Sequence, residues 1–191
     1  MTVWSEEISK HCEECGGHFQ WDAKYRVAAD DTICQLTITV RFYLELDGIP
    51  SGRLPALQQQ LRDAILRKWS GRYQLRLFEG ECRCRVYTIV FDVQMFNAPG
   101  PDRHTVKLKP GSERSNLGNL YVDDPELADV ATHEFGHAIG LIDEYPETNV
   151  CPGRPVHVGG VMDDHRLDPQ PRNFAQFANW LSAKTGCTYV P

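Results

Sequence analysis

The residues from His133 to His137, with the sequence His-Glu-Phe-Gly-His, constrain this chain more than any other stretch. Residues four apart on a helix lie on one face, one turn apart, so the imidazoles of His133 and His137 can bind one zinc ion. Glu134 lies beside them, where its carboxylate can hydrogen-bond a water on the metal and take its proton. We therefore predict a helix here that carries a zinc site on one face.

A glycine and an aspartate follow at spacings that complete this site. Gly140 falls where the helix must end, because a residue without Cβ can take the left-handed conformation that turns the chain sharply. Asp143 would then lie back toward the metal. Two nitrogens, one oxygen and an open fourth position for water are typical of a catalytic zinc site. The more distant Asp163, Asp164 and Asp168 are alternative third ligands, but the spacing from Gly140 favours Asp143.

The full pattern H-E-x-x-H-x-x-G-x-x-D resembles the zinc signature of the metzincin metalloproteases, in the variant where aspartate replaces the third histidine, as in snapalysin-like enzymes. Its continuation, Asp143-Glu144-Tyr145, resembles the IgA-peptidase-like bacterial metallopeptidases. The resemblance covers roughly the segment 133–164 and implies Zn2+ as the cofactor. It implies the same three ligands as the spacing, and Glu134 as the general base.

A second part of the resemblance lies further along the chain. In metzincins a methionine on a tight turn lies beneath the metal, and Gly159-Gly160-Val161-Met162 resembles that turn. The resemblance thus implies Met162 as the floor of the site. Several metzincins also carry a tyrosine shortly after this methionine, and none follows here. Tyr145 is the substitute candidate for stabilising the oxyanion, and His165 is a candidate for stabilising the transition state.

The rest of the chain has the pattern of an α+β protein. Segment 33–47 alternates and is rich in β-branched and aromatic residues, which predicts a strand. Leucines and other apolar residues recur at helical spacing from Leu54 to Trp69, which predicts a helix packed on the sheet. The resemblance implies a metzincin-like mixed twisted sheet with a backing helix, an active-site helix and a C-terminal helix. By the same criteria we predict strands at 73–78, 83–96 and 103–109, a helix from near Pro125 and a last helix at about 172–184.

A short extended segment, 117–121, precedes the zinc helix. In metzincins an edge strand at this place pairs with the substrate backbone, and such strand addition gives affinity without strict sequence preference. Leu117, Gly118 and Asn119 are therefore predicted to bind substrate. The alternative is a plain connecting strand.

We expect one domain, because 191 residues with 41% hydrophobic content can bury a substantial core. Within it, residues 1–22 would form a cysteine-containing N-terminal extension, 23–145 the sheet and active-site helix, and 146–191 a small C-terminal subdomain with the methionine turn. The loop 146–160, with its prolines and glycines, would wall the cleft.

Cysteine content and the N-terminal sequence point to opposite compartments. No positive segment followed by an apolar stretch begins the chain, so neither a signal peptide nor a membrane span is expected. Seven cysteines are nevertheless many for a cytosolic enzyme, and Cys151 and Cys187 are candidates for a disulfide. We expect secretion or injection by a dedicated secretion system, with that apparatus or an immunity or inhibitor protein as partner. Otherwise the protein is cytoplasmic.

The Cys12-x-x-Cys15 pair with its flanking histidines is half of a possible structural zinc site, but disulfides or free thiols are favoured. A net charge of −6 without a basic run argues against nucleic acid as a partner. The predicted function is a zinc endopeptidase acting on protein or peptide. The alternatives are a zinc amidase acting on peptidoglycan or another non-protein amide, and a non-catalytic binding module with a vestigial zinc site.

Overall fold

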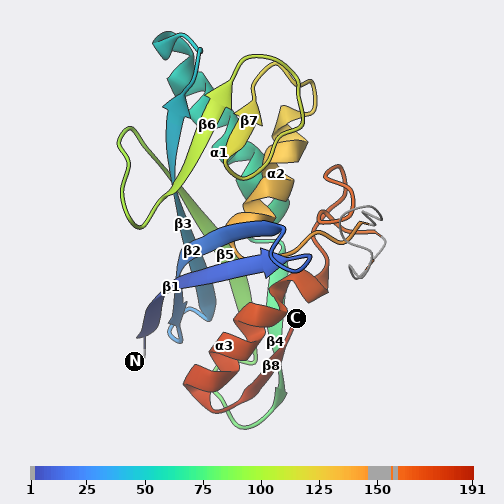
Figure 1. Ribbon diagram of the computed structural model, residues 1–191. Helices are drawn as coiled ribbons and strands as arrows, with labels where there is room; N and C mark the ends of the chain where they lie inside the picture. Colours follow the sequence, from blue (N-terminus) through green and yellow to red (C-terminus); the bar gives the residue numbers. More distant parts are fainter. Residues whose placement is uncertain (1–2, 146–155, 157–158) are drawn as a thin grey trace.

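The structure is a computed structural model that describes residues 3–145, 156 and 159–191 (Figure 1). In these ranges the chain forms one curled sheet of eight strands and three α-helices, which confirms the predicted α+β class. The strands are β1 (Val3–Glu14), β2 (Phe19–Asp30), β3 (Gln35–Leu46), β4 (Tyr73–Glu79), β5 (Val86–Phe96), β6 (His104–Lys109), β7 (Asn119–Tyr121) and β8 (Thr188–Val190). The helices are α1 (Leu54–Trp69), α2 (Leu127–Ala138) and α3 (Ala175–Thr185), with short 3-10 turns at Ser51–Arg53 and Pro171–Phe174.

Strand β3 lies at the centre of the sheet. One of its edges pairs with β5 in parallel, and β5 continues outward through antiparallel β4 and β8. Its other edge has two successive partners, because residues 35–39 pair with β2 and residues 42–46 pair with β6. Parallel β7 then extends the sheet beyond β6. The sheet is therefore split where β2 gives way to β6.

The N-terminal hairpin leaves the sheet at this split. Strands β1 and β2 pair along all of their twelve residues, whereas β2 pairs with β3 only from Arg26 to Asp30. The remaining part of the hairpin passes the C-terminal end of α2 (Figure 1). The sequence did not predict these two strands, and the expected boundary between residues 22 and 23 falls inside β2.

Helix α1 is the predicted backing helix, with the predicted bounds Leu54–Trp69. Its last residue, Trp69, is fully buried and contacts the rings of Phe91, Phe135 and Phe174. The Trp69 indole N–H also donates to the backbone carbonyl of Thr132 on α2, at 3.0 Å. The side chain of Trp69 on α1 thus contacts the sheet, the C-terminal segment and α2, the helix that carries the zinc motif.

One disulfide joins the C-terminal segment to the loop after β4, in a pairing that the sequence did not predict. Cys187 bonds to Cys82, so the predicted Cys151–Cys187 bridge is wrong. The antiparallel register of β4 with β8 is the physical reason, because it brings the chain after β4 beside Cys187. Cys34 bonds to Cys84, and Cys12 is a buried free thiol. Cys151 itself, like most of the predicted cleft loop, lies outside the described residues.

No helix in the described ranges is long and apolar enough to cross a bilayer.

Candidate metal centre

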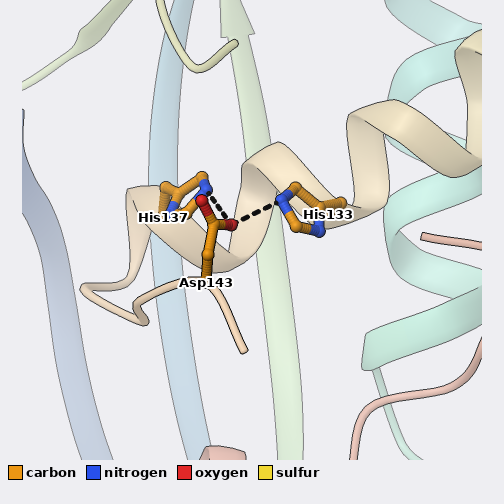
Figure 2. Close-up of side chains that lie close together, drawn as sticks. All are labelled: His133, His137 and Asp143. Carbon is orange, nitrogen blue, oxygen red and sulfur yellow. Dashed lines mark ion pairs between the residues drawn. The ribbon is translucent and has the colours of Figure 1, made fainter. Parts of the chain in front are cut away.

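Helix α2 and the turn after it bring together the three predicted metal ligands (Figure 2). The turn is made at Gly140, whose φ of 89° lies in the left-handed region, as the sequence predicted. The chain then returns so that Oδ1 of Asp143 lies 3.0 Å from Nε2 of His133 and 3.1 Å from Nε2 of His137. One possible ligand atom from each of the three residues lies within 4.8 Å of the other two.

Backbone carbonyls fix the orientation of both imidazoles. Nδ1 of His133 lies 2.7 Å from the carbonyl oxygen of Val161, and Nδ1 of His137 lies 2.9 Å from that of Leu141. A carbonyl oxygen only accepts, so each Nδ1 must carry the proton. Each Nε2 is then left to face Asp143, the arrangement by which metal-binding histidines are usually held.

These atoms suit a cation such as zinc. Two imidazole nitrogens and a carboxylate oxygen converge here. Because both Nδ1 atoms carry the protons, both Nε2 atoms present lone pairs, so an ion bound between these nitrogens and the carboxylate must be a cation. Tetrahedral zinc with bonds of 2.0–2.2 Å separates its ligand atoms by about 3.3–3.6 Å, and Oδ1 of Asp143 lies 3.0 and 3.1 Å from the two imidazole nitrogens. The same arrangement favours a proton on His137. Burial opposes the charged ring, but the hydrogen bond to Asp143 raises the pKa of His137 to about 9. Burial likewise opposes ionisation of Asp143, but the two imidazoles hold its pKa well below the usual range.

Glu134 lies next to the ligand group with one oxygen unsatisfied. Its side chain is buried, and among the described residues Oε2 finds no hydrogen-bond partner. Burial raises the pKa of this carboxyl, while the imidazoles of His137 and His133 oppose the shift. An orphaned buried carboxylate oxygen is costly, and a water held by a metal beside it would satisfy it. This placement is the one that the sequence predicted for a general base.

Met162, which the metzincin resemblance implies as the floor of the site, is fully buried and lies against Gly136 of α2. It lies within a tight turn in which the backbone amides of Asp163 and Asp164 both donate to the carbonyl of Gly160, each at 2.9 Å. The carbonyl that holds His133 belongs to Val161, the residue before the methionine. The turn therefore supports the helix from below and also orients one ligand.

Tyr145 reaches the site, but its hydroxyl contacts a ligand. Its Oη donates to Oδ2 of Asp143 at 3.0 Å and accepts from Nη2 of Arg114 at 2.9 Å. Asp143 thus uses one oxygen toward the imidazoles and the other toward Tyr145. Arg114 was not predicted as a site residue, because it is a single arginine in a polar loop between β6 and β7.

Glu144 fixes the ligand turn from the other side. Both of its carboxylate oxygens accept from Arg172, at 2.9 Å from Nε and 2.7 Å from Nη2, and the carboxylate is almost fully buried. Its backbone amide donates to the carbonyl of Met162 at 2.8 Å. Each residue of the Asp143-Glu144-Tyr145 sequence therefore has a separate part in the site, and the sequence pattern alone did not reveal that of Glu144.

The alternative third ligands make other contacts. Asp163 accepts from the backbone amide of Gly159 at 3.1 Å. Asp164 pairs with Arg166 at 2.8 Å, and Asp168 pairs with Arg72 at 2.9 Å. The group of possible metal-binding side chains found in the described ranges includes none of these aspartates.

Neither His165, the predicted transition-state stabiliser, nor His104 belongs to the group of possible metal ligands found in the described ranges. Nε2 of His165 lies 2.9 Å from a carboxylate oxygen of Glu126, and both residues line the cleft. His104 is buried and contacts the backbone of Lys24.

A cleft of about 1140 Å³ opens over the metal group. Leu117 and Gly118 line it, whereas Asn119 is not among the lining residues. The backbone amide and carbonyl of Asn119 are both bonded to Asn116, at 2.9 and 2.8 Å. Residues of β2 also line the cleft, and among them Trp21 donates its indole N–H to the carbonyl of His137 at 2.8 Å. The sequence did not predict this contact.

Comparisons of the chain with protein-family models, with curated proteins and with solved structures find no match. A functional assignment must therefore be argued from the geometry and chemistry of the site.

Proposed function

We propose that this protein is a zinc endopeptidase of the metzincin type. The observation that carries the proposal is the convergence of two Nε2 atoms and Asp143 Oδ1 beside the unsatisfied Oε2 of Glu134, on the wall of one cleft. Two histidines and one carboxylate form an established catalytic zinc set that keeps a position for water.

The chemistry follows from the side chains around that position. His133, His137 and Asp143 would hold the zinc ion, which would supply a Lewis acid and lower the pKa of a bound water toward about 7. Glu134 accepts the proton of the attacking water at Oε2 and later passes it to the leaving amide nitrogen. Its raised pKa suits both steps, because a base that must also act as an acid works best near the operating pH. Arg114 places a positive charge on the cleft wall, where negative charge develops on the substrate carbonyl.

The cleft supports a polymeric substrate. Its volume exceeds the range of about 300–1000 Å³ found for sites that enclose small molecules. Its walls come from segments far apart in the sequence, so a chain could lie across the metal group and continue on both sides. An endopeptidase needs such access on both sides of the scissile bond.

Delivery to an oxidising space is part of the proposal. The Cys34–Cys84 and Cys82–Cys187 disulfides, both within the described residues, link positions separated by 50 and 105 in the sequence, and disulfides persist mainly outside the reducing cytosol. Trapping the thiols of protein recovered from its natural host would test this. Both pairs should be found oxidised, and fully reduced cysteines would contradict it.

The decisive experiment combines metal analysis with digestion of casein. The wild type should hold one zinc per chain and cleave casein. Glu134→Gln should keep the zinc and lose the activity, and Asp143→Ala should lose zinc. Asp163→Ala serves as the matched control and should keep both. Activity retained by Glu134→Gln would refute the assignment of the base, and cleavage of cell-wall material without cleavage of casein would favour the amidase.

A further inference from the structure

The split in the sheet leaves part of β2 without a neighbouring strand on one side. At Lys24 the side chain of His104 takes the place of that strand, with Nε2 lying 3.3 Å from the backbone nitrogen of Lys24 and 3.0 Å from its carbonyl oxygen. The backbone groups of Lys24 therefore point away from β1 and toward the cleft side of the hairpin.

The same orientation recurs every second residue along a strand. Because the pairing of β1 with β2 runs without a register shift, the N–H and C=O of Asp22 and Gln20 also point away from β1. Within the described ranges no hydrogen bond is found to any of these four groups, and both residues line the cleft. We call the segment Gln20–Lys24 the β2 rail.

The β2 rail lies beside the metal group. Trp21, in its middle, donates to the carbonyl of the ligand His137 and packs its ring edge-on against that imidazole, at 5.3 Å between centroids. The segment that the sequence predicted to pair with substrate is less available there. The outward backbone groups of Asn119 are taken by Asn116, and the amide of Tyr121 bonds to the hydroxyl of Ser115.

We propose that the β2 rail binds the main chain of an extended polypeptide, which adds to the hairpin as a third strand across the cleft. The occupant follows from the spacing, since paired donors and acceptors repeated every second residue match the backbone of another strand. An unpaired strand edge is a ready template for such pairing. This inference rests on the proposed function only for the claim that the bound chain is then cut.

Proline tests the rail because it removes the backbone N–H and is tolerated in a strand only where that N–H is not needed by the ladder. The experiment uses the Glu134→Gln protein, with zinc, and fluorescein-labelled casein, followed by fluorescence anisotropy. Asp22→Pro should weaken casein binding about fivefold, the typical worth of one or two net hydrogen bonds. Asp22→Ala keeps the N–H, so it separates the backbone contribution from that of the carboxylate. Ser9→Pro is the matched control, because Ser9 pairs with Lys24 and its N–H points to the outer edge of β1.

Ser9→Pro should bind casein like its parent. Equal loss in Ser9→Pro and Asp22→Pro, equal binding by Asp22→Pro and Asp22→Ala, or no casein binding by the parent would each overturn the rail. A second measurement needs no substitution in the hairpin. In the Glu134→Gln protein, casein should slow amide hydrogen exchange at Asp22 and Gln20, and unchanged exchange would also overturn the proposal.

The two proposals fail separately. Casein that is cleaved by the wild type but leaves exchange at Asp22 unchanged would remove the rail and leave the peptidase. Casein that protects Asp22 but stays intact with the wild type would support the rail and remove the proposed hydrolysis.

Discussion

Met162 fills the space that a side chain on Gly136 would occupy. A Cβ built on Gly136 would overlap the methionine sulfur and lie 3.1 Å from its methyl carbon. Gly136 stands between the two ligand histidines on α2, and Met162 is fully buried. The close approach of the methionine turn to the zinc helix therefore depends on glycine at this position.

Gly136→Ala should therefore destabilise the protein and disturb the site. Overpacking of a filled core usually costs about 1–3 kcal/mol, and displacement of the turn would move the Val161 carbonyl that orients His133. Urea unfolding and zinc titration measure the two effects. Gly52→Ala is the matched control, since a Cβ there meets no atom within 4 Å. If Gly136→Ala were as stable as Gly52→Ala, the proposed packing would be wrong.

Tyr145→Phe should weaken zinc binding without unfolding the protein. The substitution removes the hydroxyl that donates to Oδ2 of Asp143 and accepts from Arg114. Loss of such a supporting contact typically lowers metal affinity or activity about 10- to 100-fold. Competition with a fluorescent zinc chelator gives the affinity. Unchanged affinity together with lost casein cleavage would instead point to Tyr145 acting on the substrate.

Local patterns explain what could be predicted from the sequence. Helix α1 was predicted with its observed bounds because helical periodicity is a local property that Leu57, Leu61 and Ile65 display directly. The ligand group was predicted for a similar reason, since helix geometry and one glycine turn place His133, His137 and Asp143.

The missed features depend on contacts that no local pattern records. Strand β1 is mostly exposed, with Cys12 as its one fully buried residue, so it lacks the alternation that marks a half-buried strand. Arg114 and Arg172 act on residues 31 and 28 positions away. Only the folded chain brings them to the site.

Arg172→Met should destabilise the ligand turn. It leaves Glu144 buried without its bidentate partner, which costs about 3–5 kcal/mol for a fully buried pair. Because the Arg172 side chain is 35% exposed, we expect about 2 kcal/mol. Urea unfolding measures the loss, and the double substitution Glu144→Gln with Arg172→Met should recover part of it. Arg166→Met, which breaks an exposed pair, should change stability little. No recovery in the double variant would show that the two side chains are not coupled.

His104 should make the stability of the protein depend on pH. The residue is 6% exposed, and the centroid of its ring lies 5.3 Å from that of Phe42. Burial disfavours the charged form and, although hydrogen bonds to the backbone oppose it, lowers the pKa of His104 to about 4. In the unfolded chain the pKa is about 6.5. Between these values the unfolded state binds more protons than the folded state, so the free energy of unfolding falls as the pH falls.

The size of this dependence can be isolated with His104→Leu. The neutral histidine contributes its full share of stability above about pH 6.5 and loses it progressively down to about pH 4. From about pH 7 to about pH 5, the wild type should lose about 2 kcal/mol more than the variant, at 1.36 kcal/mol per pKa unit. Urea unfolding of both proteins across this range, with a zinc chelator present, gives the difference. Parallel curves would mean that His104 titrates alike in the folded and unfolded states, contrary to its burial against β2.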